Sequence, residues 1–313
     1  MIDLAALRAL KAVDQHGSVV AAAEALGFTP SAISQQIKRL ERQSGVELLE
    51  RVGRGVILSG TGRLLVTEGD RISADLERLE STLHAHAGDA VGDVTLVGFS
   101  TAMRGLIGPV VARLMRDHPG LRIRLDEVEP WDAIEQVATG RADVALVHRW
   151  GDVVLQVPGH LDRRTVHRDE AQVILRSDHR LADRDHVTPA DLVDEHWIAT
   201  PEGTICRQWL LRMYAGTGRL PLIEHTSMEF ASHLALVAAG LGIALIPSLG
   251  RGPLPEGTRA VPVRDPVPER EALAVWRRSQ DRSPAVRALV EALVDAGSAL
   301  VRTDAGSPTR SPA

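Results

Sequence analysis

The N-terminal part of the chain alternates short amphipathic segments with residues that cap or end helices. A stripe of Leu and Val at helical spacing predicts a helix over residues 3–16. Ser18 suits an N-cap and Gly27 a C-terminal stop, so a second, alanine-rich helix is expected between them, over residues 21–26. The pattern predicts compact helices joined by tight turns.

A third helix is predicted from Thr29, which suits an N-cap, and Pro30, whose missing N–H costs nothing at the first helical position. Ile33, Ile37 and Leu40 recur at i, i+4 and i+7, so one face is buried. The opposite face carries short polar groups and one cation, which suits base edges and phosphates in a DNA major groove. The alternative is an amphipathic helix pair packed on a larger domain. The residues expected to contact DNA from this helix are Thr29, Pro30, Ser31, Ser34, Gln35 and Lys38.

The segment after this helix, ELLERVGRGVIL at residues 47–58, is typical of two short strands around a Gly53-Arg54-Gly55 turn. Arg51 and Arg54 at such a turn, beside a helix-turn-helix, predict a wing whose arginines reach the phosphate backbone or the minor groove. Residues 1–58 are therefore expected to form a winged helix-turn-helix DNA-binding domain.

Three segments in this order, AAEALGFTPSAISQQIKRLE, SGVELLER and GRGVILSGTG, resemble the N-terminal domain of LysR-type transcriptional regulators. Two positions depart from that pattern: Leu49 stands where the family usually has Phe, and Ser59 where it usually has Thr. Neither is expected to touch DNA. The resemblance implies a DNA-binding transcriptional regulator.

Ser59 is expected to cap a long helix that reaches about residue 86, within a linker over residues 59–90. Its apolar residues are spaced 7, 4, 3 and 4 apart, the a/d rhythm of a two-stranded coiled coil, and Gly62 and Gly69 are expected to weaken it. The alternative is a surface helix lying on its own domain. We expect dimerisation through Leu65, Ile72, Leu76, Leu79 and Leu83.

From residue 92 the pattern changes to alternating strands and helices, which predicts a parallel α/β sheet. The expected fold class is α+β multidomain: the winged domain, the linker helix, and a two-lobed α/β domain over residues 91–302 of the kind found in periplasmic binding proteins. Lobe I is expected over residues 91–162 and 264–302 and lobe II over 163–263, joined by two crossovers around a cleft. The Ser-, Pro- and Gly-containing tail, residues 303–313, is expected to be disordered.

Three fragments of this region, GRADVA, SDHRLA and VAAGLGIALIP, resemble the effector domain of the same regulators. Ser100 and Thr101 precede a helix, where free N–H groups and hydroxyls suit a carboxylate or another acceptor. The resemblance implies that residues 200–204 face them across a small-molecule effector. The cleft residues expected are Ser100, Thr101, Pro130, Trp131, His148, Thr200, Pro201, Glu202, Thr204, Met228 and Glu229.

The sequence leaves the charge of that effector open. If Glu202 and Glu229 face the cleft, they would repel a carboxylate effector, and Arg104 or Arg149 would have to balance its charge. Residues 98–102, GFSTA, also sit where a hydrolase nucleophile elbow would, but the fifth position is Ala instead of Gly. No downstream Asp and His pair is placed by pattern. No enzymatic activity is therefore expected.

The composition of the chain bears on its cellular compartment and on its binding partners. The net charge is −5, with 44% apolar and 25% charged residues, so DNA affinity must come from a few placed cations. One cysteine, Cys206, fits a reducing cytosol and argues against a two-cysteine redox switch. The N-terminus has no secretory pattern and no segment is long enough to span a bilayer, which predicts a cytoplasmic protein without a membrane partner.

The sequence thus predicts a LysR-type regulator that binds double-stranded operator DNA and a small-molecule effector, as a homodimer or homotetramer. No cofactor and no metal site are expected, because the twelve histidines lack ligand spacing and no phosphate-binding glycine motif occurs. The competing interpretation is a cytoplasmic α/β solute-binding or enzymatic protein with an incidental N-terminal helical domain. It would leave the polar face of the third helix unexplained.

Overall fold

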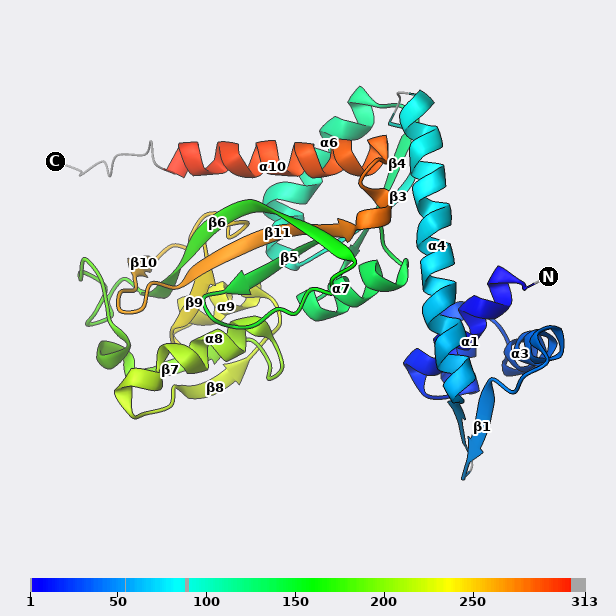
Figure 1. Cartoon of the computed structure of the whole chain (residues 1–313). Coiled ribbons are helices and arrows are strands. Elements are labelled where there is room, and N and C mark those ends of the chain that lie inside the picture. The colour runs from blue at the N-terminus through cyan, green and yellow to red at the C-terminus, as the bar shows by residue number, and fades with distance from the viewer. Residues whose placement is uncertain (1, 54, 88–89, 305–313) are drawn as a thin grey trace. The chain divides into compact units, whose positions relative to one another are not determined.

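The computed structural model describes residues 2–53, 55–87 and 90–304 and separates into two compact units, Met1–Glu80 and Ser81–Ala313 (Figure 1). The first unit contains the predicted winged helix-turn-helix. The long helix α4 (Gly60–Ala87) begins in the first unit and ends in the second, within the expected linker.

The N-terminal unit packs three helices and a two-stranded hairpin around one small core. The predicted N-caps are formed: the N–H groups of Ala21 and Ala32 donate to Ser18 Oγ and Thr29 Oγ1 at 3.1 and 3.2 Å. Gly27 ends the second helix in the left-handed region, at φ 68°. The elements are α1 (Leu4–His16), α2 (Val19–Leu26), α3 (Pro30–Ser44), β1 (Leu49–Val52) and β2 (Gly55–Leu58).

The start of α4 is fixed to the hairpin. Ser59 Oγ accepts from the N–H of Gly62 at 2.9 Å and donates to the carbonyl of Glu47 at 2.8 Å. From the sequence, Gly62 was expected to weaken the helix. The structure shows a further role, because a Cβ at this position would lie 2.3 Å from the carbonyl oxygen of Leu48. The glycine therefore permits the helix to approach the hairpin.

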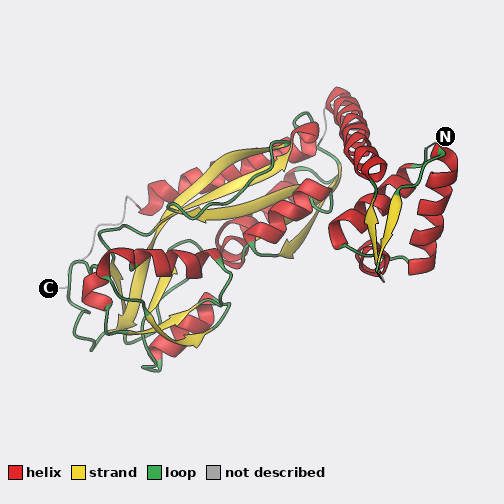
Figure 2. Cartoon of the chain, turned by 60° about the horizontal axis from the view of Figure 1, so that its bottom comes forward, coloured by secondary structure: helices red, strands yellow, loops and turns green. Residues whose placement is uncertain are grey.

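Lobe I of the C-terminal unit is one mixed sheet with helices on both faces (Figure 2). The expectation of a parallel sheet is wrong in part: β3 pairs in parallel with β4 and β5, but β11 pairs antiparallel with β5 and β6. The strand β11 returns from lobe II, so it enters the sheet in the opposite direction. The elements are β3 (Gly92–Gly98), β4 (Leu121–Glu127), α7 (Pro130–Thr139), β5 (Val144–Trp150), β11 (Glu269–Arg277) and α10 (Pro284–Asp304).

The helix expected after Ser100 and Thr101 is interrupted. It consists of α5 (Ser100–Ala102), a π-helical turn (Met103–Ile107) and α6 (Gly108–Asp117). Pro109 offers no N–H to the carbonyl of Gly105, which disfavours a regular α-helix there. A Cβ on Gly105 would lie 2.7 Å from the backbone nitrogen of Gly250, so the turn after β9 packs tightly against this irregular turn.

Lobe II combines a parallel pair, β7 with β8, and the strands that extend the large sheet, β9 and β10. A short 3₁₀ turn, Pro189–Leu192, precedes β7. The elements are β7 (His196–Ala199), α8 (Ile205–Met213), β8 (Leu222–Thr226), α9 (Phe230–Ala238), β9 (Ala244–Pro247) and β10 (Thr258–Pro262).

One crossover between the lobes is a single strand, β6 (Leu161–Arg176), visible in Figure 1 as the long green ribbon. Its residues 161–170 pair with β11, while residues 171–176 pair with β9 and β10. Lobe I therefore extends to about residue 170, beyond the expected boundary at 162. The second crossover joins β10 to β11.

At the C-terminal end, α10 continues to Asp304, so residues 303–304 are helical and not part of a tail. The remainder of the predicted tail, residues 305–313, lies outside the described residues. No helix among the residues that the structure describes is long and apolar enough to cross a membrane.

Candidate functional site

The N-terminal unit presents the polar face of α3 to solvent. Ile33, Ile37 and Leu40 are buried in the unit's core, as predicted, and this orientation turns the other face outward. Thr29, Pro30, Ser31, Gln35 and Lys38 are exposed and Ser34 is half-buried. A groove of about 830 Å³ runs along α3, and its lining includes Gln35, Lys38, Arg39 and Arg42.

The hairpin is attached to α3 by one carboxylate. Glu41 Oε1 accepts hydrogen bonds from the N–H groups of Leu48 and Leu49, at 2.9 and 3.4 Å. Arg51 is exposed on β1, beside the turn of the hairpin, whereas Arg54 lies outside the described residues. Arg39 and Arg42 were not among the predicted DNA-contacting residues, although their cationic side chains on α3 were visible in the sequence.

In the C-terminal unit, a cavity of about 30 Å³ lies between the two lobes. That volume holds about one water molecule. Lobe I supplies the end of β3, the start of α5, His148 on β5 and Arg270 on β11, while lobe II supplies the segment before α8 and the start of α9. The lining residues are Phe99, Ser100, Thr101, Glu127, Glu129, His148, Thr200, Thr204, Cys206, Met228, Phe230 and Arg270.

Arg270 lines this cavity and is fully buried. Its Nε and Nη2 donate to the two carboxylate oxygens of Asp169, both at 2.9 Å, and its Nη1 donates to Thr101 Oγ1 at 3.0 Å. The guanidinium also lies over the rings of Phe99 and Trp150, 5.2 and 5.8 Å from their centroids. The charge of Arg270 is therefore already compensated, and Thr101 is held in place by it.

The lobes are also joined at the edge of the cleft. Arg104, in the π-helical turn, donates from Nη1 to Glu229 Oε2 at 3.0 Å and from Nε to the carbonyl of Gly250 at 3.3 Å. Ser100 Oγ donates to the same oxygen of Glu229 at 3.4 Å. Both Arg104 and Glu229 are more than one third exposed, so solvent weakens this ion pair.

Two further carboxylates, Glu127 and Glu129, line the cavity and form no ion pair with any of the described residues. Desolvation raises the pKa of Glu127, and the neighbouring charge of Glu229 raises it further, against a smaller opposing effect of Arg104. Desolvation also raises the pKa of Glu129, together with the charges of Asp132, Glu127 and Glu229. The sequence interpretation named neither Glu127 nor Glu129.

Several buried polar atoms beside the cleft have no hydrogen-bond partner within the part of the chain that the structure describes. They include His148 Nδ1, which belongs to a ring lining the first cavity, and Trp150 Nε1 and His233 Nδ1, whose rings line an adjoining cavity of about 20 Å³. Burial lowers the pKa of His148 well below its usual value, assisted by the charge of Arg270, so the ring is neutral. Each such atom costs about 1–3 kcal/mol unless a ligand or water satisfies it.

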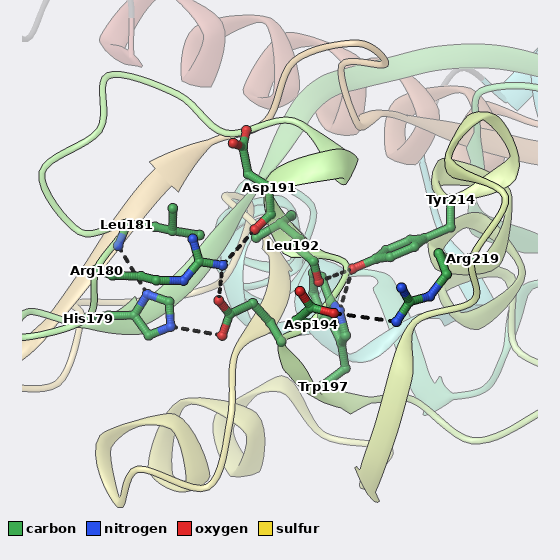
Figure 3. A network of polar contacts seen from close by, with 10 residues as sticks. His179, Arg180, Leu181, Asp191, Leu192, Asp194, Trp197, Tyr214 and Arg219 are labelled. Carbon is green, nitrogen blue, oxygen red and sulfur yellow. Dashed lines mark hydrogen bonds and ion pairs between the residues drawn. The ribbon is translucent and has the colours of Figure 1, made fainter.

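The loop of lobe II that lines the cavity is held by its own hydrogen bonds. Thr200 Oγ1 and Thr204 Oγ1 are 2.7 Å apart, and Thr204 caps α8 by accepting from the N–H of Arg207. Behind the loop, Trp197 Nε1 donates to the hydroxyl of Tyr214 at 2.7 Å, and that hydroxyl donates to the carbonyl of Leu192 at 2.8 Å (Figure 3). The wall of the cleft is therefore part of a rigid core.

The structure brings together six of the eleven residues predicted for the cleft: Ser100, Thr101, His148, Thr200, Thr204 and Met228. Glu229 reaches the edge of the cleft through its contacts with Arg104 and Ser100. Trp131 packs instead against a hydrophobic cluster that includes Trp150, Pro130 begins α7 as a buried residue, and Pro201 and Glu202 do not line the cavity.

The predicted dimerisation residues separate into two groups. Ile72, Leu76, Leu79 and Leu83 are exposed on α4. Leu65 is partly buried and packs instead against the core of the N-terminal unit. No group of three or more potential metal ligands occurs among residues 2–53, 55–87 and 90–304.

Comparisons with known proteins agree with this architecture. Residues 4–63 match the family model of the bacterial regulatory helix-turn-helix protein, lysR family, and residues 87–298 match the LysR substrate binding domain. The chain belongs to the LysR family. It is a DNA-binding transcriptional regulator of the LysR type, in which an effector-binding domain follows the helix-turn-helix along the sequence.

Among similar proteins, an uncharacterized HTH-type transcriptional regulator, YfeR from Shigella flexneri, is 30% identical over 98% of each chain. The fold of a full-length OxyR variant from Pseudomonas aeruginosa is similar, with a TM-score of 0.68 and 20% identity over 94% of this chain and 95% of that one. A Corynebacterium glutamicum OxyR variant, whose structure is described as bound to H₂O₂, has a TM-score of 0.60 and 20% identity over 100% and 99% of the two chains.

Proposed function

We propose that this LysR regulator is a cytoplasmic oligomer that reads its operator with α3 and responds to a small molecule bound between the two lobes. The observation that carries the effector site is the interlobe cavity, with its ordered hydroxyls and the unpaired buried nitrogen of His148. Because the cavity holds only about one water molecule, an organic effector requires the lobes to separate about β6 and the second crossover.

Such a separation would make the effector a switch. A ligand changes the balance between two arrangements only if it binds one of them better than the other. The ion pair between Arg104 and Glu229 and the packing of Gly250 on the π-helical turn favour the closed arrangement. A ligand that enters the cavity therefore favours the open one.

DNA recognition is tested by comparing Gln35→Ala with Arg51→Ala. Gln35 can pair bidentately with adenine, so its loss should cost about 1–3 kcal/mol on the cognate operator and little on scrambled DNA. Arg51, like Arg54, is predicted to contact a phosphate, so Arg51→Ala should weaken binding to both duplexes and reduce the salt slope by about one. Arg71→Ala on α4 removes the same charge as a control. Equal losses for Gln35→Ala on both duplexes would contradict its assignment.

The effector site is tested with Thr101→Val and its conservative control, Thr101→Ser. The valine variant removes the hydroxyl that accepts from Arg270, whereas the serine variant keeps it. Ligand-induced change of the DNA footprint should be lost in the first and retained in the second, with DNA binding by the unliganded protein unchanged. A lower melting temperature with a normal footprint response would instead assign Thr101 a packing role.

A second candidate function, peroxide sensing, is suggested by the similar OxyR variant described as H₂O₂-bound. Cys206 lines both cavities, but burial raises the pKa of its thiol to about 12. The thiolate is the reactive form of cysteine. With one cysteine in 313 residues, an intramolecular disulfide cannot form either. The geometry therefore favours reversible binding of a small molecule.

A further inference from the structure

The charges around the interlobe cavity do not balance. Arg270 is the one cation among the residues that line it, and both oxygens of the buried Asp169 already accept from its guanidinium. Arg104, beside the cavity, is paired with Glu229. Glu127 and Glu129 line the same cavity, and neither forms an ion pair with any residue that the structure describes. The protein groups around it therefore leave an excess of negative charge.

The proton affinity of these carboxylates reflects that excess. The pKa of Glu127 and that of Glu129 are both raised, first by desolvation and then by neighbouring carboxylates. Desolvation disfavours charge of either sign, but the part of the rise that comes from neighbouring carboxylates reflects a negative potential, which favours a cation there as well. A carboxylate ligand would have to enter against the same field, and the charge of Arg270 is already compensated.

A second, independent feature of the cavity also points to a ligand. His148 is 3% exposed, and its Nδ1 has no hydrogen-bond partner among the described protein groups. The ring is neutral, and a neutral imidazole has one nitrogen that donates and one that accepts, so it can pair with a polar group of a ligand inside the cavity. The apolar side chains of Phe230 and Met228 complete the wall on the side of lobe II.

We propose that the effector is an organic cation, a primary amine or a guanidinium compound, whose charge is held by Glu127 and Glu129 and whose N–H groups reach His148. This proposal rests on the proposed function, because it assumes that the cleft is the effector site. It adds the chemical class of the ligand, which the residues at the edge of the cleft left open.

The test uses three probes with the same four-carbon chain and different ends: putrescine, butane-1,4-diol and succinate. Each is titrated into the full-length protein by isothermal calorimetry, with melting temperature as a second measurement. Putrescine is expected to bind and to raise the melting temperature, while the diol and the dicarboxylate bind weakly or not at all. Because the attraction is electrostatic, putrescine binding should weaken at high salt.

Substitutions of single carboxylates test which residues hold the charge of the ligand. Glu127→Gln and Glu129→Gln should each reduce putrescine affinity roughly tenfold or more, as expected for losing a hydrogen bond to a charged group. Asp126→Asn is the matched control: it removes one carboxylate from β4, next in sequence to Glu127, and successive strand residues point to opposite faces. Its putrescine affinity should remain unchanged.

Two outcomes separate failure of this proposal from failure of the proposed function. Binding of succinate but not putrescine, abolished by Thr101→Val, would keep the cleft as the effector site and overturn the cationic class. Putrescine binding that is unaffected by Glu127→Gln, Glu129→Gln and Thr101→Val would place the ligand elsewhere and overturn both. Absence of binding by all three probes at tens of millimolar would also overturn the cationic class.

Discussion

Asp169 and Arg270 stand directly opposite each other on the antiparallel strands β6 and β11, and both side chains are almost completely buried. The strand β6 leads from lobe I to lobe II, and β11 returns from lobe II to lobe I. The N–H of Leu249, in the turn after β9, also donates to Asp169, at 2.8 Å. One buried ion pair therefore ties together both crossovers, the turn after β9 and, through Thr101, the start of α5.

We expect Arg270→Met to be strongly destabilising, because it leaves the carboxylate of Asp169 buried without its cation. The loss in the free energy of unfolding should be about 3–5 kcal/mol, measured by urea denaturation. The double variant Arg270→Met with Asp169→Leu should recover much of that loss, because no unpaired charge remains. Arg176→Met, which removes an exposed ion pair with Asp178, should change little. A double variant no more stable than the single one would contradict this account.

The ion pair between Asp169 and Arg270 also predicts that the stability of the protein decreases at acidic pH. Burial alone would raise the pKa of Asp169, but the charge and hydrogen bonds of Arg270 outweigh it, so the folded pKa is lowered. Its contribution to stability is therefore fully present above the unfolded pKa of about 4 and is lost as the pH falls through the lower folded value. The double variant should show a smaller loss of stability over that range than the wild type.

The local features of the sequence predicted the local structure well. Ser18, Thr29 and Gly27 each specify a helix end through their own backbone or side-chain geometry, and all three behave as expected. The buried stripe of α3 was also visible, because helical spacing alone defines it. The polar face available for DNA follows directly from that stripe.

Features that depend on distant residues were not predictable in the same way. The strand β6 carries a run of charged residues before Ala171, without the alternation typical of a strand, so the first half of this strand is not visible in the sequence pattern. Arg270 lies 101 residues from Asp169 and looks like an ordinary surface cation in the sequence. Glu127 and Glu129 reach the cavity only because β4 ends beside it.

Two glycines at the start of α4 give a matched test of backbone packing. Gly62→Ala should destabilise the N-terminal unit by about 1–3 kcal/mol, because the new Cβ meets the carbonyl of Leu48. Gly60→Ala has open space around it and should be neutral or stabilising by up to about 1 kcal/mol. Thermal unfolding of both variants checks the difference. Equal melting temperatures would show that the hairpin adjusts freely.

The exposed apolar residues of α4 predict self-association. We expect Leu76→Asp to dissociate at least one interface and to reduce operator binding, because a palindromic site requires two recognition helices about 34 Å apart. Thr67→Asp adds the same charge on the same helix outside this set of residues and should leave the assembly intact. Sedimentation velocity over a range of concentrations measures both. An unchanged assembly in Leu76→Asp would favour the surface-helix alternative.

Cys206 should be chemically inert in the native protein. Burial raises its pKa to about 12, so at pH 8 the thiolate amounts to about one part in ten thousand of the thiol. In unfolded protein the thiol pKa returns to about 8.5, so the thiolate fraction at pH 8, and with it the rate of alkylation, should be higher by about three orders of magnitude. Rates of reaction with iodoacetamide, in buffer and in urea, measure this difference, and Cys206→Ser gives the background. The serine variant should also retain the effector response. Rapid alkylation of the native protein, together with a peroxide-dependent footprint that Cys206→Ser abolishes, would instead assign this cysteine a sensing role.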